Sequence, residues 1–466
     1  MSDTLMISVS GMRGHVGTDL TPELVARHAA ALGAWARTSA AGQVAAARRP
    51  DGRPVVVLGR DARTSGAMFA HAAAAGLMSV GADVIDVGVV PTPTVQLAVE
   101  HHHAGAGLIL TASHNPIEWN ALKFVGPDGI FLDAESGARL RALAEEGPPR
   151  MGWDGIGSLT EDREAVARHL DAVLALPMID VAAIRARRFH VALDCVRGAG
   201  ASAIPPLLER LGCRVSAINL EPDGRFPRAP EPVPENLGEL GALVRRTGAV
   251  IGLAVDPDVD RLAVVDERGT PIGEDYTLAF AIRAVLDGRS SAGDSRTVVV
   301  NLSTSLVVED AARAAGARLV RAPVGEANVA RSIRDEGAVI GGEGNGGVIL
   351  PALHIGRDAP LGVALILHLL ATSGVTVSEL VAGSPQYTIV KAKGPRGPEL
   401  APLYERLRKR FGDAQTDERD GLRLAWPDRW LHVRPSGTEP IVRLIAEAPT
   451  AADADALVAA ARELLQ

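Results

Sequence analysis

The sequence predicts an α/β protein in which three similar strand–helix units precede a smaller α+β unit. Short β-rich runs are each followed by an Ala/Leu-rich helical stretch, and this pattern starts three times along the 466 residues. The starts lie roughly 110–140 residues apart, within the usual size of a domain. Because strands that alternate with helices form parallel sheets covered by helices, each unit should contain such a sheet.

The first unit shows the alternation most clearly. Its first helix carries small residues at i, i+3 and i+4 spacing, which is typical of a helix packed closely on its neighbours. We expect strands over Pro54–Leu58, Asp83–Val87 and Ala106–Leu110, and helices over Ser65–Val80 and Thr94–Glu100.

The second and third units repeat the order strand, helix, strand. No residue-level repeat accompanies this similarity of organisation. The expected elements are a strand over Phe189–Leu193, a helix over Ser202–Leu211, a strand over Arg214–Ile218, and then a strand over Thr297–Asn301, a helix over Leu306–Ala315 and a strand over Arg318–Arg321.

The last ninety or so residues differ, because several strand-like runs there are separated by only two helices, which favours an α+β arrangement. Linkers are expected at Gly147–Gly157, near Gly273 and at Ser373–Ser384, and the Ala-rich segment Thr38–Arg49 is typical of a helix end and a loop. The C-terminal elements are expected at Tyr387–Lys391, Glu399–Phe411 (helix), Gly421–Trp426, Trp430–Val433, Val442–Glu447 and a helix from Ala451.

Composition excludes several classes of protein. Only Cys195 and Cys213 are present and they form no CxxC pair, which argues against a disulfide framework and a structural zinc site. Aromatic residues make up 3% and the net charge is −8, so a nucleic-acid partner is not expected. The apolar run Leu361–Ala371 is too short for a membrane span, which takes about 20 residues, and Met1–Ser10 lacks the features of a signal peptide. We therefore expect a cytoplasmic protein with no membrane partner.

The first motif that carries chemistry is TASHNP, residues 111–116, directly after an apolar strand-like run. Loops that leave parallel strands are where open α/β sheets bind ligands. Ser113 could be a nucleophile there, although the G-x-S-x-G frame of a hydrolase is absent. The alternative is an Asn-Pro turn with a capping serine.

The second motif is DPDVDR, residues 256–261, with three carboxylates at alternate positions. In a tight loop they would converge, and such oxygen ligands suit Mg²⁺ or Ca²⁺. An EF-hand would place Glu267 at position twelve, but Arg261 stands where the turn needs Gly and the flanking residues are strand-like. A solvated acidic turn is the other reading, disfavoured because the carboxylates would repel one another. An octahedral Mg²⁺ would need further oxygens, and a phosphorylated serine could supply one.

Two further loops are rich in ligand-binding groups. The glycine loop at 341–347 would present Glu343 and Asn345 to sugar hydroxyls, and it is neither a P-loop nor a dinucleotide fingerprint. A plain flexible turn is its competing interpretation. The loop RPSGTEP at 434–440 combines a guanidinium, hydroxyls and backbone amides around Gly437, an arrangement that fits a phosphate. A metal site at His101–His103 is not expected, because adjacent histidines cannot all point one way.

Together, TASHNP, DPDVDR and RPSGTEP, in this order and spacing, resemble the α-D-phosphohexomutase family over nearly the whole chain. Its members include phosphoglucomutases, phosphomannomutases and phosphoglucosamine mutases. SGMRG at 10–14 is similar to the family's opening substrate loop, and 223–236 fits its second domain. The resemblance implies three similar mixed-sheet α/β domains plus a smaller C-terminal α+β domain around a central cleft. We place the domains at 1–155, 156–272, 273–375 and 376–466.

The resemblance also implies an isomerase that moves a phosphoryl group between the 6- and 1-positions of a hexose phosphate through a 1,6-bisphosphate. Ser113 would be the phosphoserine and would share one Mg²⁺ with the three aspartates. Lys123, in the stretch NALK, matches the general acid/base. The implied residues are Arg13, His114 and Arg261 for the transferring phosphoryl, Asp256, Asp258 and Asp260 for the metal, Glu343 and Asn345 for the sugar, and Arg434, Ser436, Gly437 and Thr438 for the other phosphate.

One departure from the family concerns substrate choice. Many relatives carry Ser and His where this chain has Asn345 and Gly347. An amide still donates and accepts hydrogen bonds, so hydroxyl recognition is retained. The sugar loop and the opening loop are similar to the archaeal-like phosphoglucosamine mutase branch, which favours glucosamine 6-phosphate, while glucose and mannose phosphates stay open. Rival classes are a metal-dependent sugar phosphatase and a sugar-phosphate sensor; the sensor is disfavoured because it needs no nucleophile.

Overall fold

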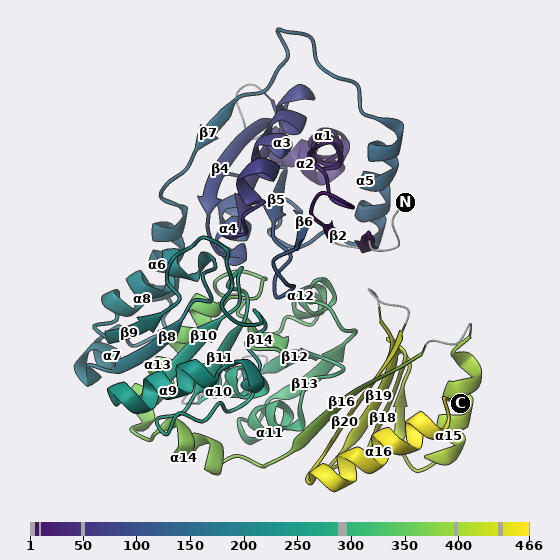
Figure 1. Cartoon of the computed structure of the whole chain (residues 1–466). Coiled ribbons are helices and arrows are strands. Elements are labelled where there is room, and N and C mark those ends of the chain that lie inside the picture. The colour runs from purple at the N-terminus through teal and green to yellow at the C-terminus, as the bar shows by residue number, and fades with distance from the viewer. Residues whose placement is uncertain are drawn as a thin grey trace.

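The computed structural model describes residues 5–8, 11–47, 52–287, 296–395, 399–436 and 441–465. In this part of the chain the strands form four sheets that follow one another around the molecule, each with helices against it (Figure 1). Three sheets combine parallel strands with antiparallel strands at one edge, and the last is wholly antiparallel. The predicted fold class, three similar mixed-sheet α/β domains and a smaller α+β domain, is confirmed.

The first sheet has the strand order β1-β2-β6-β5-β3-β4-β7 and is covered on both faces. Successive side chains of a strand point to opposite faces. Accordingly, Val56 and Leu58 pack with α1, α3 and α5, whereas Val55 and Val57 pack with α4. The elements are β1 (Met6–Ser8), β2 (Gly11–His15), α1 (Pro22–Thr38), α2 (Ala40–Ala46), β3 (Val55–Arg60), α3 (Gly66–Ser79), β4 (Asp83–Val89), α4 (Thr92–His101), β5 (Ala106–Leu110), β6 (Trp119–Val125), α5 (Ala134–Glu146) and β7 (Leu159–Glu161).

Strand β7 joins the first sheet after a loop. The expected linker Gly147–Gly157 contains neither helix nor strand. β7 then pairs in parallel with β4, so the first sheet takes a strand from beyond residue 155. The four domain ranges given above stay predictions.

The second and third domains share one hydrophobic core. Residues of both sheets, such as Leu253 and Val298, pack in the same cluster with α10 and α13. The elements are α6 (Ala165–Leu174), α7 (Val181–Arg187), β8 (His190–Asp194), the 3-10 turn Ala199–Ser202, α8 (Ile204–Arg210), β9 (Arg214–Ile218), the 3-10 turn Pro234–Asn236, α9 (Gly238–Thr247), β10 (Ile251–Val255), β11 (Leu262–Val265), α10 (Asp275–Leu286), β12 (Thr297–Asn301), α11 (Leu306–Ala314), β13 (Arg318–Ala322), α12 (Glu326–Asp335), β14 (Ile340–Glu343), β15 (Gly347–Ile349) and α13 (Ala359–Ser373).

The apolar run Leu361–Ala371 forms most of α13, and its buried side chains fill that shared core. Within the ranges that the structure describes, no helix is long and apolar enough to cross a membrane.

Two segments expected to be loops contain short helices. α2 lies within Thr38–Arg49, where the Ser39 hydroxyl accepts a hydrogen bond from the Gly42 N–H at 3.1 Å. α14 (Val377–Ala382) lies within Ser373–Ser384 and begins with a capping box of Thr376 and Glu379. Such caps satisfy N–H groups that a helix start leaves unpaired, which stabilises helices too short to be evident from periodicity.

The fourth domain is a five-stranded antiparallel sheet, order β16-β20-β19-β18-β17, with two helices against it. Polar side chains bond it to the third domain. Glu447 accepts hydrogen bonds from the Ser305 hydroxyl and the Leu306 N–H, and Ser303 Oγ lies 2.8 Å from His432 Nδ1. The elements are β16 (Thr388–Pro395), α15 (Ala401–Arg410), β17 (Gln415–Asp417), β18 (Leu422–Ala425), β19 (Trp430–Pro435), β20 (Ile441–Ala448) and α16 (Ala451–Glu463).

His432 predicts a pH dependence of stability. Burial lowers its pKa from 6.5 to about 4, and its Nε2 lies 2.7 Å from the Asp420 carbonyl oxygen. The unfolded chain therefore binds a proton between these values that the folded chain does not. The stabilisation is complete above pH 6.5 and falls by about 3 kcal/mol as the pH decreases through 4.

His432→Gln should remove this contribution to the pH dependence. The melting temperature measured from pH 7.5 to 4 should fall less steeply for the variant than for the wild type. His71→Gln, at an exposed position of α3, serves as the control and should follow the wild type. Parallel curves for wild type and His432→Gln would contradict the prediction.

Candidate active site

Most of the sequence-predicted residues lie on strands of the first three sheets or directly after them. Ser113 follows β5, the three aspartates join β10 to β11, and Glu343 ends β14. Lys123 is on β6 and Arg13 on the neighbouring strand β2. Since β5, β10 and β14 are strands of parallel pairs, their carboxyl ends are where an α/β sheet presents binding loops.

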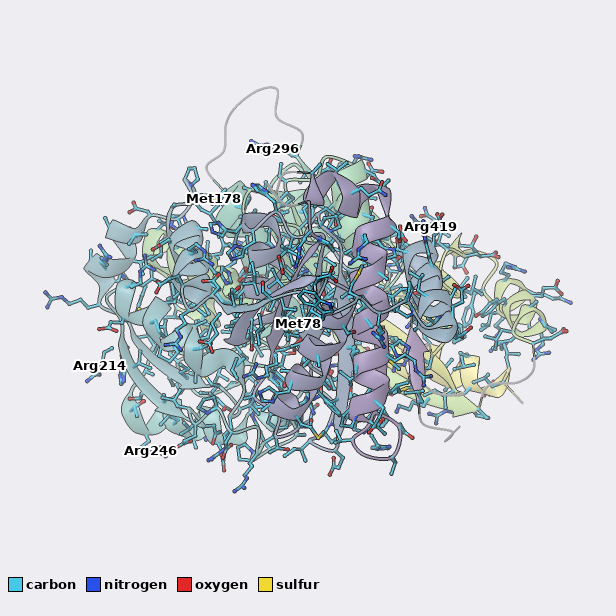
Figure 2. The ribbon with its side chains drawn as sticks, turned by 90° about the horizontal axis from the view of Figure 1, so that it is seen from above. Met78, Met178, Arg214, Arg246, Arg296 and Arg419 are labelled. Carbon is cyan, nitrogen blue, oxygen red and sulfur yellow. The ribbon has the colours of Figure 1, made fainter. Side chains whose placement is uncertain are left out.

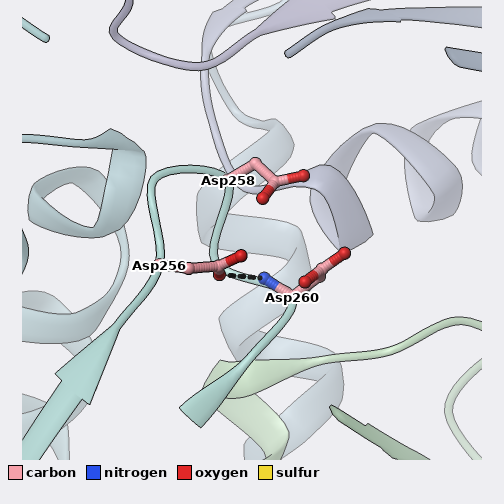
Figure 3. A group of neighbouring side chains, drawn as sticks. All are labelled: Asp256, Asp258 and Asp260. Carbon is pink, nitrogen blue, oxygen red and sulfur yellow. Dashed lines mark hydrogen bonds between the residues drawn. The ribbon is translucent and has the colours of Figure 1, made fainter. Parts of the chain in front are cut away.

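The three aspartates converge in one buried loop. Asp256, Asp258 and Asp260 are at most 1% exposed, and one oxygen from each lies within 4.8 Å of the others (Figure 3). Asp256 Oδ1 accepts the backbone N–H groups of Asp260 and Arg261, both at 3.1 Å. Val259 has φ +63°, a left-handed conformation that costs a β-branched residue energy and that this loop imposes.

These carboxylates fit a divalent cation. Burial, together with repulsion from Asp260 and Asp258, raises the pKa of Asp256 well above its ordinary value. Within the described residues, Asp258 Oδ1 and Asp260 Oδ1 are buried and accept no hydrogen bond. Buried oxygens without donors are costly, and hard oxygen ligands are those that Mg²⁺ prefers. The acidic triad can therefore hold a metal ion such as Mg²⁺.

Ser113 is held beside the triad. Its Oγ donates to Asp256 Oδ2 at 3.0 Å, and His114 Nδ1 lies 3.4 Å from the same hydroxyl. Ser113 is 3% exposed and has φ +50°. Its N–H donates to Thr111 Oγ1 at 2.9 Å, so the strained backbone is fixed by a neighbour in the same loop.

A buried ion pair that the sequence analysis did not single out, Arg63 with Asp61, holds this loop in place. Arg63 donates to the carbonyl oxygens of Ser113 and Asn115, both at 2.6 Å, and also to those of Pro116 and Trp119. Its partner Asp61 accepts from Arg63 Nε at 3.1 Å and from Thr111 Oγ1 at 2.6 Å. A signal was available: the sequence GRDAR places an acid and a base at the end of an apolar strand, where uncompensated charge is rare.

Cations from two domains face the triad. Lys123 Nζ donates to Asp258 Oδ2 at 2.7 Å and lies 3.7 Å from Asp260 Oδ2. Burial alone would lower its pKa, but attraction by the two carboxylates raises it. Arg261 Nε lies 4.0 Å from Asp256 and 3.7 Å from Asp260, and its Nη1 donates to Glu231.

Arg13 and His114 complete this group of basic side chains. Arg13 donates to Asn115 Oδ1, in the serine loop. Burial, reinforced by Arg261 and Arg13, lowers the pKa of His114 well below its ordinary value. By contrast, exposed arginines such as Arg214 and Arg246 lie at the periphery of the molecule (Figure 2).

Glu343 lies in the same buried network, but Asn345 does not. Glu343 Oε1 accepts from Asn301 Nδ2 at 2.9 Å and from the Gly325 N–H at 3.0 Å. Its Oε2 accepts from Arg357 at 3.0 Å, a residue that the sequence analysis did not single out. Asn345 is partly exposed and accepts a hydrogen bond from the Gly347 N–H at 3.3 Å, a contact within its own turn.

The predicted phosphate loop lies on the fourth domain and is described only in part. Arg434 donates twice to Asp420, at 3.0 and 3.2 Å, and Asp420 accepts the Val324 N–H of the third domain at 3.0 Å. Ser436 is 4% exposed. Gly437 and Thr438 lie outside the described residues. The interpretation of this loop as a phosphate site stays a prediction.

All four domains match models of one family. Residues 5–150, 167–269 and 273–387 match α/β/α domains I, II and III of phosphoglucomutase/phosphomannomutase, and residues 398–464 match its C-terminal domain. The chain belongs to this phosphohexomutase family. It is accordingly an isomerase that moves a phosphoryl group on a hexose phosphate.

Similar proteins of the family agree in length and fold. A phosphoglucomutase/phosphomannomutase of Thermococcus kodakarensis is 39% identical over 94% of this chain and 93% of its own. A Methanopyrus kandleri protein named "Probable phosphoglucosamine mutase" is 37% identical, with the same coverage. The solved structure of a phosphohexomutase-family protein from Burkholderia thailandensis, 26% identical, superposes with a TM-score of 0.83 over 99% of this chain and 96% of its own.

Because Thr111 bonds both Ser113 and Asp61, its loss should reduce turnover rather than substrate binding. Thr111→Val keeps the side-chain shape but removes the bonds to Ser113 N–H and Asp61. We expect kcat of the mutase to fall by about tenfold or more with KM changed by less than about twofold, because Ser113, the predicted nucleophile, would be misplaced and chemistry would slow. Thr247→Val, on the distant helix α9, is the matched control. A rise in KM without a change in kcat would contradict this role.

Proposed function

We propose that this phosphohexomutase interconverts the 6- and 1-phosphates of a hexosamine, with glucosamine 6-phosphate preferred, and that Ser113 carries the phosphoryl group between the two positions. One observation supports this assignment above the others. The buried hydroxyl of Ser113 lies 3.0 Å from Asp256 of the acidic triad, and the Lys123 amine donates to Asp258 of the same triad.

In the first step, the free hydroxyl of the hexose monophosphate attacks phosphoserine 113. The P–Oγ bond breaks as a P–O bond to the sugar forms. The charged Lys123 Nζ would give a proton to the leaving Ser113 Oγ and would then take up the proton of the sugar hydroxyl. The resulting 1,6-bisphosphate reverses its orientation, and the Ser113 hydroxyl attacks its other phosphoryl group, while Lys123 would give a proton to the released sugar oxygen and take up that of the serine. Atoms and charges balance over the cycle, and no water enters.

The other residues stabilise charge and hold the sugar. His114 and the cations Arg13 and Arg261 would donate to the oxygens of the phosphoryl group in transfer, where negative charge is spread. Glu343 and Asn345 would bind sugar hydroxyls. Arg434, Ser436, Gly437 and Thr438 would bind the phosphate that does not react.

Asp256, Asp258 and Asp260 would hold one Mg²⁺ together with the phosphate on Ser113. When bound, Mg²⁺ would supply positive charge to the phosphate oxygens during transfer. The hexose 1,6-bisphosphate would also serve as activator, because it can phosphorylate an unphosphorylated Ser113.

The choice of hexosamine rests on two supports. The chain carries Asn345 and Gly347 in the sugar loop, and the Methanopyrus relative bears the phosphoglucosamine mutase name. The Thermococcus relative is named for glucose and mannose phosphates instead, and these are the alternative substrates. A cytoplasmic location, a small-molecule sugar phosphate as partner and the absence of a nucleic-acid partner stay proposals.

Ser113→Ala tests the nucleophile. Mutase activity should be lost, because no other group accepts the phosphoryl, while the far-ultraviolet circular dichroism should match the wild type. The assay compares glucosamine, glucose and mannose phosphates with a trace of the matching 1,6-bisphosphate. Ser202→Ala, whose hydroxyl bonds only the Ala199 carbonyl in the described residues, is the control.

Three outcomes would contradict parts of this assignment. Retained activity in Ser113→Ala would exclude the phosphoserine route. Release of inorganic phosphate without isomerisation would favour the phosphatase alternative. If glucosamine phosphate were the poorest substrate of the three, the preferred substrate would be wrong.

Asp258→Asn tests the metal site. Replacing one charged oxygen ligand should weaken Mg²⁺ binding, measured by isothermal titration calorimetry, by about tenfold or more. Asp266→Asn, after β11 and away from the triad, provides the control for loss of a buried acid. Equal affinities in wild type and Asp258→Asn would contradict metal binding by the triad.

A further inference from the structure

Arg357 is buried among three carboxylates that come from three different segments of the chain. The residue is 6% exposed. Its Nη2 donates to Asp260 Oδ2 at 2.6 Å, its Nε to Glu326 Oε2 at 3.0 Å, and its Nη1 to Glu343 Oε2 at 3.0 Å. One guanidinium thus bonds the aspartate loop, the start of α12 and the glycine loop at the same time.

The positive charge of Arg357 offsets the negative charge of the buried carboxylates around it. A buried carboxylate is costly unless a cation or several donors compensate it. A guanidinium is not deprotonated in proteins, so the side chain is charged among Asp260, Glu326 and Glu343. A planar guanidinium directs separate N–H groups to separate acceptors, which a lysine ammonium cannot do over the same geometry.

The backbone of Arg357 is also held by hydrogen bonds, its own and those of the next residue. The Arg357 N–H donates to Glu326 Oε1 at 3.2 Å. The next residue, Asp358, begins α13 by accepting the Leu361 N–H at 2.8 Å. His169 and His354 bond Asp358 from other segments, at 2.8 and 3.0 Å. Arg357 therefore has little freedom to follow either loop, and it holds both in place.

At the aspartate loop, Arg357 selects which oxygen of Asp260 is available. It occupies Oδ2 and leaves Oδ1, which is buried and has no hydrogen-bond partner in the described residues. A partner outside the ligand set that fixes a carboxylate in this way typically contributes 10- to 100-fold to metal affinity.

At the glycine loop, Arg357 fixes the carboxylate of Glu343 opposite the bonds from Asn301 and Gly325. A carboxylate held from two sides is pre-organised, so sugar hydroxyls need not order it on binding. The metal loop and the sugar loop consequently depend on one side chain.

We propose that Arg357 is a positioning residue that couples the two halves of the substrate site: it orients Asp260 for Mg²⁺ and Glu343 for the sugar, so that both are bound well only when the guanidinium is present. This inference rests on the roles proposed above for Asp260 and Glu343. It assigns a joint function to a residue that acts through the carboxylates it bonds.

The test measures the two ligands separately. Mg²⁺ affinity and the affinity for glucosamine 6-phosphate in the presence of a chelator are determined by isothermal titration calorimetry for wild type, Arg357→Lys and Arg357→Met. Arg357→Lys keeps the positive charge but loses the planar guanidinium, and we expect it to weaken each affinity by about tenfold. Arg357→Met should weaken both further if it folds; Arg357→Lys suffices for the test if it does not.

Two variants serve as controls. Arg331→Lys replaces a guanidinium on α12 that donates to the Ala327 and Phe131 carbonyl oxygens. This variant should leave both affinities within about twofold of the wild type. Glu343→Gln should weaken sugar binding while leaving Mg²⁺ affinity close to that of the wild type, because it does not bond the triad.

The outcomes separate this inference from the proposed function. If the wild type bound neither Mg²⁺ nor the sugar phosphate, the proposed function would fail. If it bound both and Arg357→Lys kept either affinity unchanged, the coupling role alone would be overturned. A lower melting temperature with unaltered affinities would likewise reduce Arg357 to a structural role.

Discussion

The structure depends on the burial of three neighbouring carboxyl groups in one loop. Asp256, Asp258 and Asp260 are nearly inaccessible and their oxygens lie within 4.8 Å, so they require compensation from elsewhere. Lys123 supplies it from the first domain and Arg357 from the third, at 2.7 and 2.6 Å. Each of these domains therefore contributes charge that offsets the charge of another. The relative placement of the first three domains and the composition of the site depend on the same electrostatic interactions.

Backbone strain accompanies this arrangement at two chemically important points. Ser113 and Val259 both have positive φ, at the serine loop and the aspartate loop. Such conformations cost of order 1–3 kcal/mol and persist only where surrounding contacts fix them. For Ser113 the contacts are Thr111 on its N–H and Arg63 on its carbonyl, and Asp61 bonds both. The position of Ser113 therefore depends on the hydrogen bonds of Asp61, Arg63 and Thr111.

The net charge of −8 proved a poor guide to the ligand. The basic side chains beside the triad are few and are buried or partly buried, whereas arginines such as Arg214 and Arg246 are exposed at the periphery (Figure 2). Charge focused in a low-dielectric site decides whether an anion binds. The fourth domain is attached to the third by polar contacts, including the hydrogen bonds of Glu447 and Asp420, whereas the second and third domains share a hydrophobic core.

The sequence by itself determined several of the parallel strands and the chemistry of the loops beside them, because buried parallel strands appear as short apolar runs and ligand-binding loops as polar motifs next to them. The strands β2 and β6, which carry Arg13 and Lys123, were not predicted. Ala106–Leu110 was predicted with the bounds it has. Only the tertiary structure decided what supports those loops. Arg357 and Asp260 are 97 residues apart and Arg63 and Ser113 are 50 apart. Which carboxylate or carbonyl a buried arginine meets depends on the packing of whole domains, and no local pattern encodes it.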